Sequence, residues 1–165
     1  MTRALRATTT VVAILAAGCG GGGSPSSPSY PSVKGTYGSY GGGVVGASRL
    51  RWIAPDGTVT MQDCWAVTSI PTQNGAQFSG TVERIAPCNS QATFAGTVGT
   101  DGSIAFTLTQ GRWGSCTMSG EGQYAGIVML GSLIANGRVI VQCDDGRATT
   151  IEEQLTGRLP VPPPG

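Results

Sequence analysis

The stretch Phe78–Leu108, FSGTVERIAPCNSQATFAGTVGTDGSIAFTL, decides the fold class. Large apolar residues or glycine alternate with small polar ones in 78–82, and apolar residues alternate with Ala and Thr in 104–108. A period of two is typical of an antiparallel strand with one face in the core. The pattern of 78–82 returns as Phe-Ala-Gly-Thr-Val at 94–98. The central glycine of each copy permits the tight coiling that a small barrel needs to close.

Turn signals divide the chain between residues 33 and 159 into similar short segments. Such Asp-Gly and Asn-Gly pairs suit two-residue type I′ hairpin turns, in which φ is positive at both positions. They occur at Asp56-Gly57, Asn74-Gly75, Asp101-Gly102, Asn136-Gly137 and Asp145-Gly146. Apolar residues show no helical spacing, and glycine interrupts nearly every window. We therefore predict that residues 33–159 form an all-β domain, a small antiparallel up-and-down barrel or sandwich of about 8–10 strands.

Alternation extends to two more segments on the N-terminal side. In 49–52, arginine alternates with Leu50 and Trp52, and in 58–62, Val59 and Met61 alternate with Thr and Gln. We expect the apolar members of each set to face the core and the polar members to face solvent.

The N-terminus has the composition of an export signal. Arg3 and Arg6 precede the run 7–18, ATTTVVAILAAG, which is apolar or small throughout. A run of this length suits the hydrophobic region of a signal peptide and is too short to span a bilayer. The residues that follow, 20–32, read GGGGSPSSPSYPS and lack the apolar content of a core. We expect them to form a flexible tether.

The junction Leu15-Ala-Ala-Gly-Cys19 resembles the lipobox of bacterial lipoproteins. This resemblance implies that residues 1–18 are a lipoprotein signal peptide and that Cys19 receives diacylglycerol. Residues 19–32 are then the lipidated cysteine and its tether. Gly20 after the cysteine implies sorting to the outer membrane, facing the periplasm or the exterior. We expect a membrane-anchored protein of the cell envelope.

Four cysteines remain for the domain, and an even number in an exported chain indicates two disulfide bonds. They are Cys64, Cys88, Cys116 and Cys143. Three connectivities are open, and a meander favours pairs that are neighbours in sequence, Cys64–Cys88 and Cys116–Cys143. A zinc site is disfavoured because no C-x2-C pair is present.

Composition argues against several function classes. The chain has no histidine, which removes Ser-His-Asp and Cys-His catalysis, and its net charge of +1 comes without basic clusters. We expect no enzyme activity, no cofactor, no metal and no nucleic-acid partner. The acidic pairs Asp144-Asp145 and Glu152-Glu153 are interpreted as a hairpin turn and a solvated strand edge.

The domain loosely resembles the small Gly- and Thr-rich barrels of the lipocalin and avidin type. Lipocalins usually open with G-x-W, whereas this chain has Gly35-Thr-Tyr37. The resemblance therefore implies the barrel and assigns no ligand. Candidate contact residues for a ligand or partner are aromatic side chains and one loop arginine: Trp52, Arg112, Trp113 and Tyr124. Trp113 and Arg112 lie in a Gly-flanked, loop-like segment, and we expect them to be exposed together.

These observations predict non-enzymatic binding of a small molecule or an envelope component. The alternative is a protein–protein role, as an inhibitor or an envelope-assembly accessory. Residues 160–165, PVPPPG, are expected to form a Pro-rich terminal spacer.

The anchor is tested by replacing the lipid acceptor. The variant Cys19→Ser is expected to leave the membrane fraction, because a thioether-linked lipid needs the cysteine sulfur. Cell fractionation followed by immunoblotting measures the distribution, and retention of the variant in the membrane fraction would refute the lipobox interpretation.

Overall fold

The structure, a computed structural model, describes residues 28–38 and 46–159. The predicted signal peptide, Cys19, most of the tether and the tail 160–165 lie outside these residues. Within the described part of the chain, no helix is long and apolar enough to cross a membrane.

Ten β-strands lie in the described residues, all paired antiparallel. They are β1 (Gly35–Tyr37), β2 (Ala47–Ile53), β3 (Val59–Asn74), β4 (Gln77–Arg84), β5 (Ser90–Val98), β6 (Ser103–Trp113), β7 (Cys116–Met118), β8 (Gly122–Met129), β9 (Ser132–Cys143) and β10 (Ala148–Arg158).

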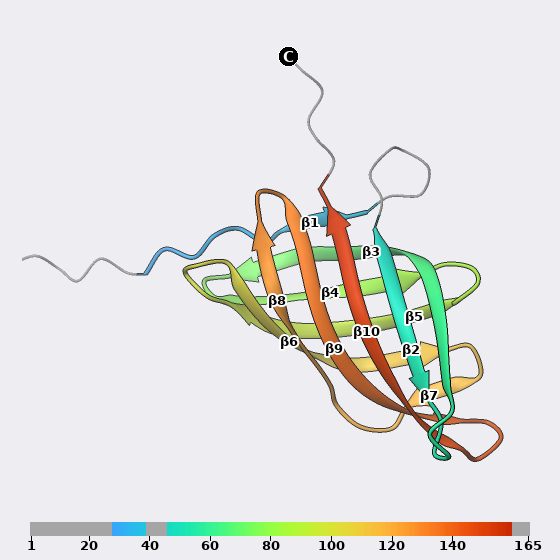
Figure 1. Ribbon diagram of the computed structural model, residues 1–165. Helices are drawn as coiled ribbons and strands as arrows, with labels where there is room; N and C mark the ends of the chain where they lie inside the picture. Colours follow the sequence, from blue (N-terminus) through green and yellow to red (C-terminus); the bar gives the residue numbers. More distant parts are fainter. Residues whose placement is uncertain (1–27, 39–45, 160–165) are drawn as a thin grey trace, which may run out of the picture.

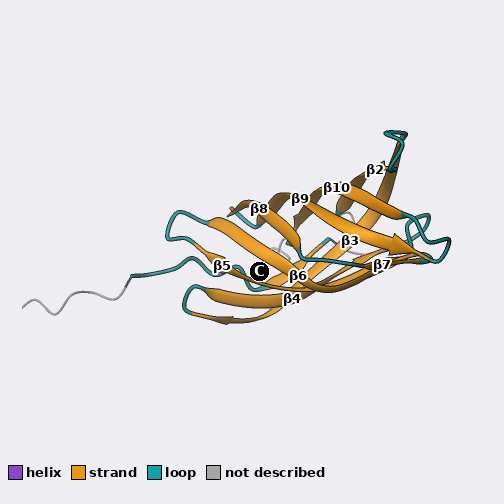
Figure 2. Cartoon of the chain, turned by 90° about the horizontal axis from the view of Figure 1, so that it is seen from below, coloured by secondary structure: helices purple, strands orange, loops and turns teal. Residues whose placement is uncertain are grey.

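The strands form a closed up-and-down barrel, which confirms the all-β prediction and decides between the barrel and the sandwich that the sequence left open. From β2 to β6 and from β8 to β10, each strand pairs with the next one in sequence, and β10 pairs with β2 to close the sheet. The wall has eight positions, because β1 and β2 share one edge of β3, and β7 and β8 share the facing edges of β6 and β9. Figure 2 shows β2, β8, β9 and β10 along one side and β3 to β6 along the other. A barrel of this size encloses just enough room for side chains.

Three of the predicted turns share a geometry different from type I′. In the turns at Asp56, Asp101 and Asp145, only the following glycine has positive φ, between 82° and 85°. Each aspartate accepts a hydrogen bond from the amide of the residue two positions later. Such a three-residue loop needs one left-handed residue instead of two. The prediction of the turn positions is confirmed, and that of the turn type is wrong.

Asn136-Gly137 is not a turn but lies in the middle of β9. The adjacent hairpin instead turns at Leu130-Gly131, where both residues have positive φ, 50° and 73°. Gly137 has a packing role, because a Cβ there would overlap the ring of Tyr124 on β8.

The inward face of β3 is also opposite to the one predicted. Val59 is 43% exposed and Met61 57% exposed, whereas Cys64 and Ala66 are buried. The cause is the register with β2, in which the buried Leu50 lies opposite Gln62. Directly paired residues point to the same face, so Met61 must point outward.

An aromatic ladder inside the barrel explains the internal repeat. Phe94 lies opposite Gly80, Phe106 opposite Gly96, and Tyr124 opposite Gly137. A Cβ at Gly80 or Gly137 would overlap the facing ring, and a Cβ at Gly96 would overlap the Cβ of Phe106. Successive rings also contact each other, with centroids 6.2 Å apart for Phe78–Phe94, 4.9 Å for Phe94–Phe106 and 5.0 Å for Phe106–Tyr124. In β4 and β5, the Phe-x-Gly spacing therefore places one aromatic ring and one glycine on the inner face of the same strand. Each aromatic pair contributes about 0.5–1.5 kcal/mol beyond its buried area.

The two disulfide bonds close the end of the barrel opposite the β8–β9 turn. They join Cys64 to Cys88 and Cys116 to Cys143, the connectivity that sequence neighbourhood favours. The second bond lies between directly paired residues of β7 and β9. Loops of 24 and 27 residues closed in this way constrain the unfolded chain by about 3 kcal/mol each.

The ladder is tested with glycine substitutions. Gly137→Ala is expected to lower the free energy of unfolding by about 1–3 kcal/mol, because the added methyl group must displace the ring of Tyr124. Urea unfolding with the disulfides intact measures the change. Gly120→Ala is the matched control, because a Cβ there meets no atom within 4 Å. Equal effects of the two substitutions would contradict the ring-over-glycine packing.

Candidate functional site

The barrel interior contains a fully buried ion pair. Nε of Arg84, at the end of β4, donates to Oε1 of Glu153 on β10 at 2.7 Å, and Nη2 donates to Oε2 at 2.6 Å. Both side chains have no exposed surface. Glu153 also accepts hydrogen bonds from the hydroxyls of Ser48 and Tyr124, both at 2.6 Å. We call these four residues the interior polar cluster.

The cluster holds its charges in fixed protonation states. Burial raises the pKa of Glu153, but the charge of Arg84 and the donated hydrogen bonds outweigh it, so this pKa lies below its ordinary value. Burial and the neighbouring carboxylate hold the pKa of Tyr124 well above its ordinary value. Glu153 is therefore a carboxylate at neutral pH and Tyr124 a neutral donor. A carboxylate that accepts four hydrogen bonds has its lone pairs occupied and is poorly suited to act as a general base.

Trp113 lies beside the cluster, with its ring 5.4 Å from the guanidinium carbon of Arg84. It is 2% exposed, and its indole nitrogen has no hydrogen-bond partner among the described residues. The expectation of an exposed Trp113 is wrong. Trp113 ends β6 and points inward, while its neighbour Arg112 is exposed and donates to the carbonyl of Gly114. Adjacent strand residues face opposite sides, so these two side chains do not form one contact surface.

The other candidate contact residues also belong to the interior or its margin. Tyr124 is buried in the interior polar cluster, and Trp52 is partly buried against the core. The interpretation of Glu152 and Glu153 as a solvated edge holds only for Glu152, which is 43% exposed and pairs with Arg51. Glu153 belongs to the interior, where Arg84 compensates its charge. Arg84 was missed, although it continues the alternation of Phe78 and Val82 on the inner face of β4. An arginine in this position does not reveal that a partner carboxylate from another strand compensates its charge.

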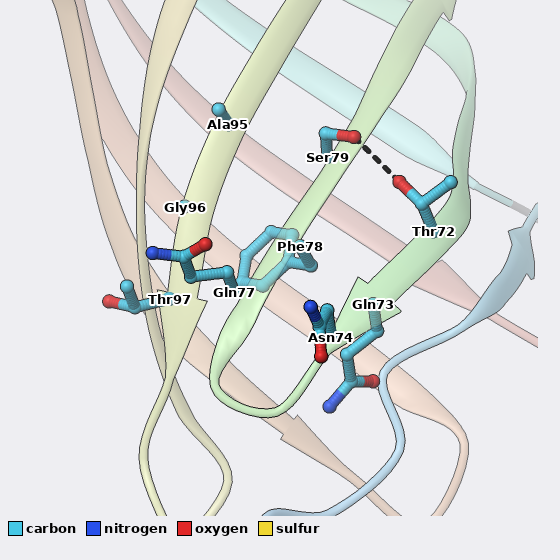
Figure 3. A pocket seen from close by; sticks show the side chains of 9 residues that line it. All are labelled: Thr72, Gln73, Asn74, Gln77, Phe78, Ser79, Ala95, Gly96 and Thr97. Atoms are coloured by element: carbon cyan, nitrogen blue, oxygen red, sulfur yellow. Dashed lines mark hydrogen bonds between the residues drawn. The ribbon is translucent and has the colours of Figure 1, made fainter.

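Residues that the structure describes line three hollows on the outside of the barrel wall. The first, about 570 Å³, lies over β3, β4 and β5. Figure 3 shows its lining side chains near the Gly75 turn, including the hydrogen bond between Thr72 and Ser79. Gln73 at its margin donates to the carbonyl of Pro31 and accepts from the amide of Val33, which fixes the entering chain to this end.

The other two hollows adjoin, since both are lined by Gln123 and Asn136. Their volumes are about 590 and 670 Å³, and we call them together the wall hollow. Its charged lining consists of Arg49, Arg51, Arg138, Glu152 and the edge of Glu153. Arg49 pairs with Asp63 and Arg51 with Glu152. In the part of the chain that the structure describes, Arg138 forms no ion pair, although it lies directly opposite Glu152 of β10. The wall hollow therefore offers an exposed guanidinium beside amide groups.

Comparison with models of protein families, with curated proteins and with solved structures found no match for this chain. The function proposed below therefore follows from the sequence and from the geometry of the barrel.

The interior polar cluster is tested by removing one of its charges. Arg84→Met is expected to lower the free energy of unfolding by about 3–5 kcal/mol, because Glu153 is left charged and unpaired in the interior. The double variant Arg84→Met/Glu153→Gln should be less destabilised than Arg84→Met, since the amide needs no counter-charge. Urea denaturation measures both variants.

Arg51→Met is the control, because it breaks a half-exposed ion pair and should have a much smaller effect. The pH dependence gives a second check. Because the pKa of Glu153 is lowered by folding, its contribution is present above the unfolded value of ~4.3 and is lost as pH falls through the folded value. The free energy of unfolding of Glu153→Gln should therefore fall less steeply with decreasing pH than that of the unsubstituted protein. An unchanged acid slope would contradict the charged state of Glu153.

Proposed function

We propose that this protein is a lipid-anchored lipoprotein of the cell envelope whose barrel binds an envelope macromolecule on its outer wall, without catalysis. The observation that carries this proposal is that the barrel interior is filled by its own side chains. Anchoring rests on the lipobox resemblance at Cys19 and on the tether that follows it.

The filled interior supports recognition from outside. Arg84 and Glu153 meet across the barrel, and the ladder from Phe78 to Tyr124 occupies the neighbouring space. A small ligand at this level would have to displace a buried ion pair or an aromatic ring. The free-energy cost of leaving either charge unpaired is larger than the binding free energy that a small ligand usually provides.

The wall hollow supports a partner with acidic or hydroxyl groups. Arg138 on β9 is exposed, and the amides of Gln123 and Asn136 lie on the same outer face. Arginine binds carboxylate and phosphate groups through two parallel hydrogen bonds, and the amides donate and accept. Cell-envelope polymers and proteins carry both kinds of group.

The unpaired indole nitrogen of Trp113 favours a second candidate function. A buried donor without a partner gains a hydrogen bond from any small polar molecule that reaches it. Native mass spectrometry of the purified chain distinguishes the two functions, because a retained small-molecule mass supports the second candidate.

The outer-wall proposal is tested by photo-crosslinking in cells. A photoreactive residue at Asn136 should yield a covalent adduct of discrete mass, since this position lines the wall hollow. The same residue at Asp56, in a turn at the opposite end from the tether, is the positional control. Arg138→Glu should weaken the adduct at Asn136 several-fold. Equal labelling at the two positions, or labelling insensitive to Arg138→Glu, would count against recognition by the wall hollow.

A further inference from the structure

The β8–β9 hairpin ends in an exposed apolar surface. Ile127 and Ile134 are directly paired and both point outward, with 36% and 46% of their surfaces exposed. Met129 is 58% exposed, and Leu130 at the turn is 97% exposed. We call these four residues the hairpin tip. Monomeric proteins rarely group exposed apolar side chains in this way without a binding role.

The backbone of Leu130 strengthens this interpretation. Its φ of 50° lies in the left-handed region, which glycine, asparagine and aspartate occupy at much lower cost than leucine. The barrel has such residues at its other turns, as at Asp101-Gly102. A bulky apolar residue in an unfavourable conformation, with its side chain fully in solvent, indicates that the side chain is used.

The entering chain reaches the barrel at the same end. Leu159 donates its amide to the carbonyl of Gly131 in the hairpin turn, and its side chain packs on Gly35 at the start of β1. Figures 1 and 2 show the segment that leads into β1 at this end. Only nine peptide units separate Cys19 from Pro28, a span of at most roughly 30 Å. A lipid on Cys19 would therefore hold this end of the barrel close to the membrane.

Two cations lie close to the β8–β9 turn. Lys34 and Arg158 are exposed beside the hairpin tip, and Arg158 is paired with Ser132, directly after the turn. Asp101, in the β5–β6 turn that contacts Val128, is an acidic residue at this end. The β9–β10 turn at the opposite end carries Asp144 and Asp145, and Asp145 is paired with Arg147. Cations next to apolar side chains suit a bilayer with anionic headgroups.

We propose that the hairpin tip inserts into the surface of the bilayer that holds the lipid anchor, with Lys34 and Arg158 at its anionic headgroups. This inference rests on the proposed lipidation of Cys19. It fixes the orientation of the barrel, with the disulfide-closed end pointing away from the membrane. The wall hollow then faces sideways, accessible to a partner in the envelope.

The test compares two methionines of equal exposure, Met129 in the hairpin tip at 58% and Met61 on the wall at 57%. The lipidated full-length protein is reconstituted in phosphatidylethanolamine–phosphatidylglycerol vesicles, treated with hydrogen peroxide and analysed by peptide mass spectrometry. Met129 should be oxidised several-fold more slowly than Met61. In the unlipidated Cys19→Ala protein without vesicles, the two rates should be similar.

A conservative variant keeps the fold intact during the test. Leu130→Asn retains the turn, because asparagine tolerates positive φ, and should bring the oxidation rate of Met129 close to that of Met61. Ile140→Asn is the matched control, because Ile140 is an exposed apolar residue of the same strand far from the turn, and it should leave Met129 protected.

The remaining outcomes separate this inference from the proposed function. Equal oxidation of both methionines on vesicle-bound protein overturns membrane contact by the hairpin tip and leaves the anchor standing. Protection of Met129 in native membranes but not in pure lipid vesicles also overturns it, in favour of a protein partner. Absence of an acyl mass on Cys19 overturns both proposals.

Discussion

The contact between Arg84 and Glu153 constrains the rest of this barrel. The two residues are 69 positions apart and lie on opposite sides of the wall, β4 and β10, so their contact forms only when the sheet is closed. Neither charge is tolerated in the interior without the other. The pair therefore ties the closure of the barrel to one register of its strands. Ser48 and Tyr124 extend this constraint to β2 and β8 by donating to the same carboxylate.

The aromatic ladder and the polar cluster form one continuous filling. The ladder starts at Phe78, crosses β5 and β6, and ends at Tyr124, whose hydroxyl contacts Glu153. Three glycines in the facing strands, Gly80, Gly96 and Gly137, make the room for these residues. Because its own side chains fill the barrel, the surfaces that remain for binding a partner are the outer wall and the two ends.

Local patterns predicted local features well. The Asp-Gly pairs identified three hairpin turns, because an aspartate that caps the loop and a glycine with positive φ act within three residues. The disulfide pairing followed from the meander, in which sequence neighbours are neighbours in space. Asn136-Gly137 misled because the same dipeptide serves a different purpose in β9, where Gly137 accommodates a ring from another strand. A turn signal does not reveal whether its glycine is needed for conformation or for space.

The amino-acid sequence by itself determined the all-β class, the barrel-sized set of antiparallel strands and the positions of most turns, and it favoured the pairing of the four domain cysteines that the structure shows. Alternation predicted the inner face of β4 and β6, where Phe78 and Phe106 are buried, but in β3, at the end of β6 and in β10 only the tertiary structure decided which residues are inside. That choice placed Met61 outside, and Trp113 and Glu153 inside. The physical reason is that a shift of one residue moves every side chain of a strand to the other face, and the register with the neighbouring strands decides between the two faces. The interior polar cluster and the hairpin tip both result from that selection.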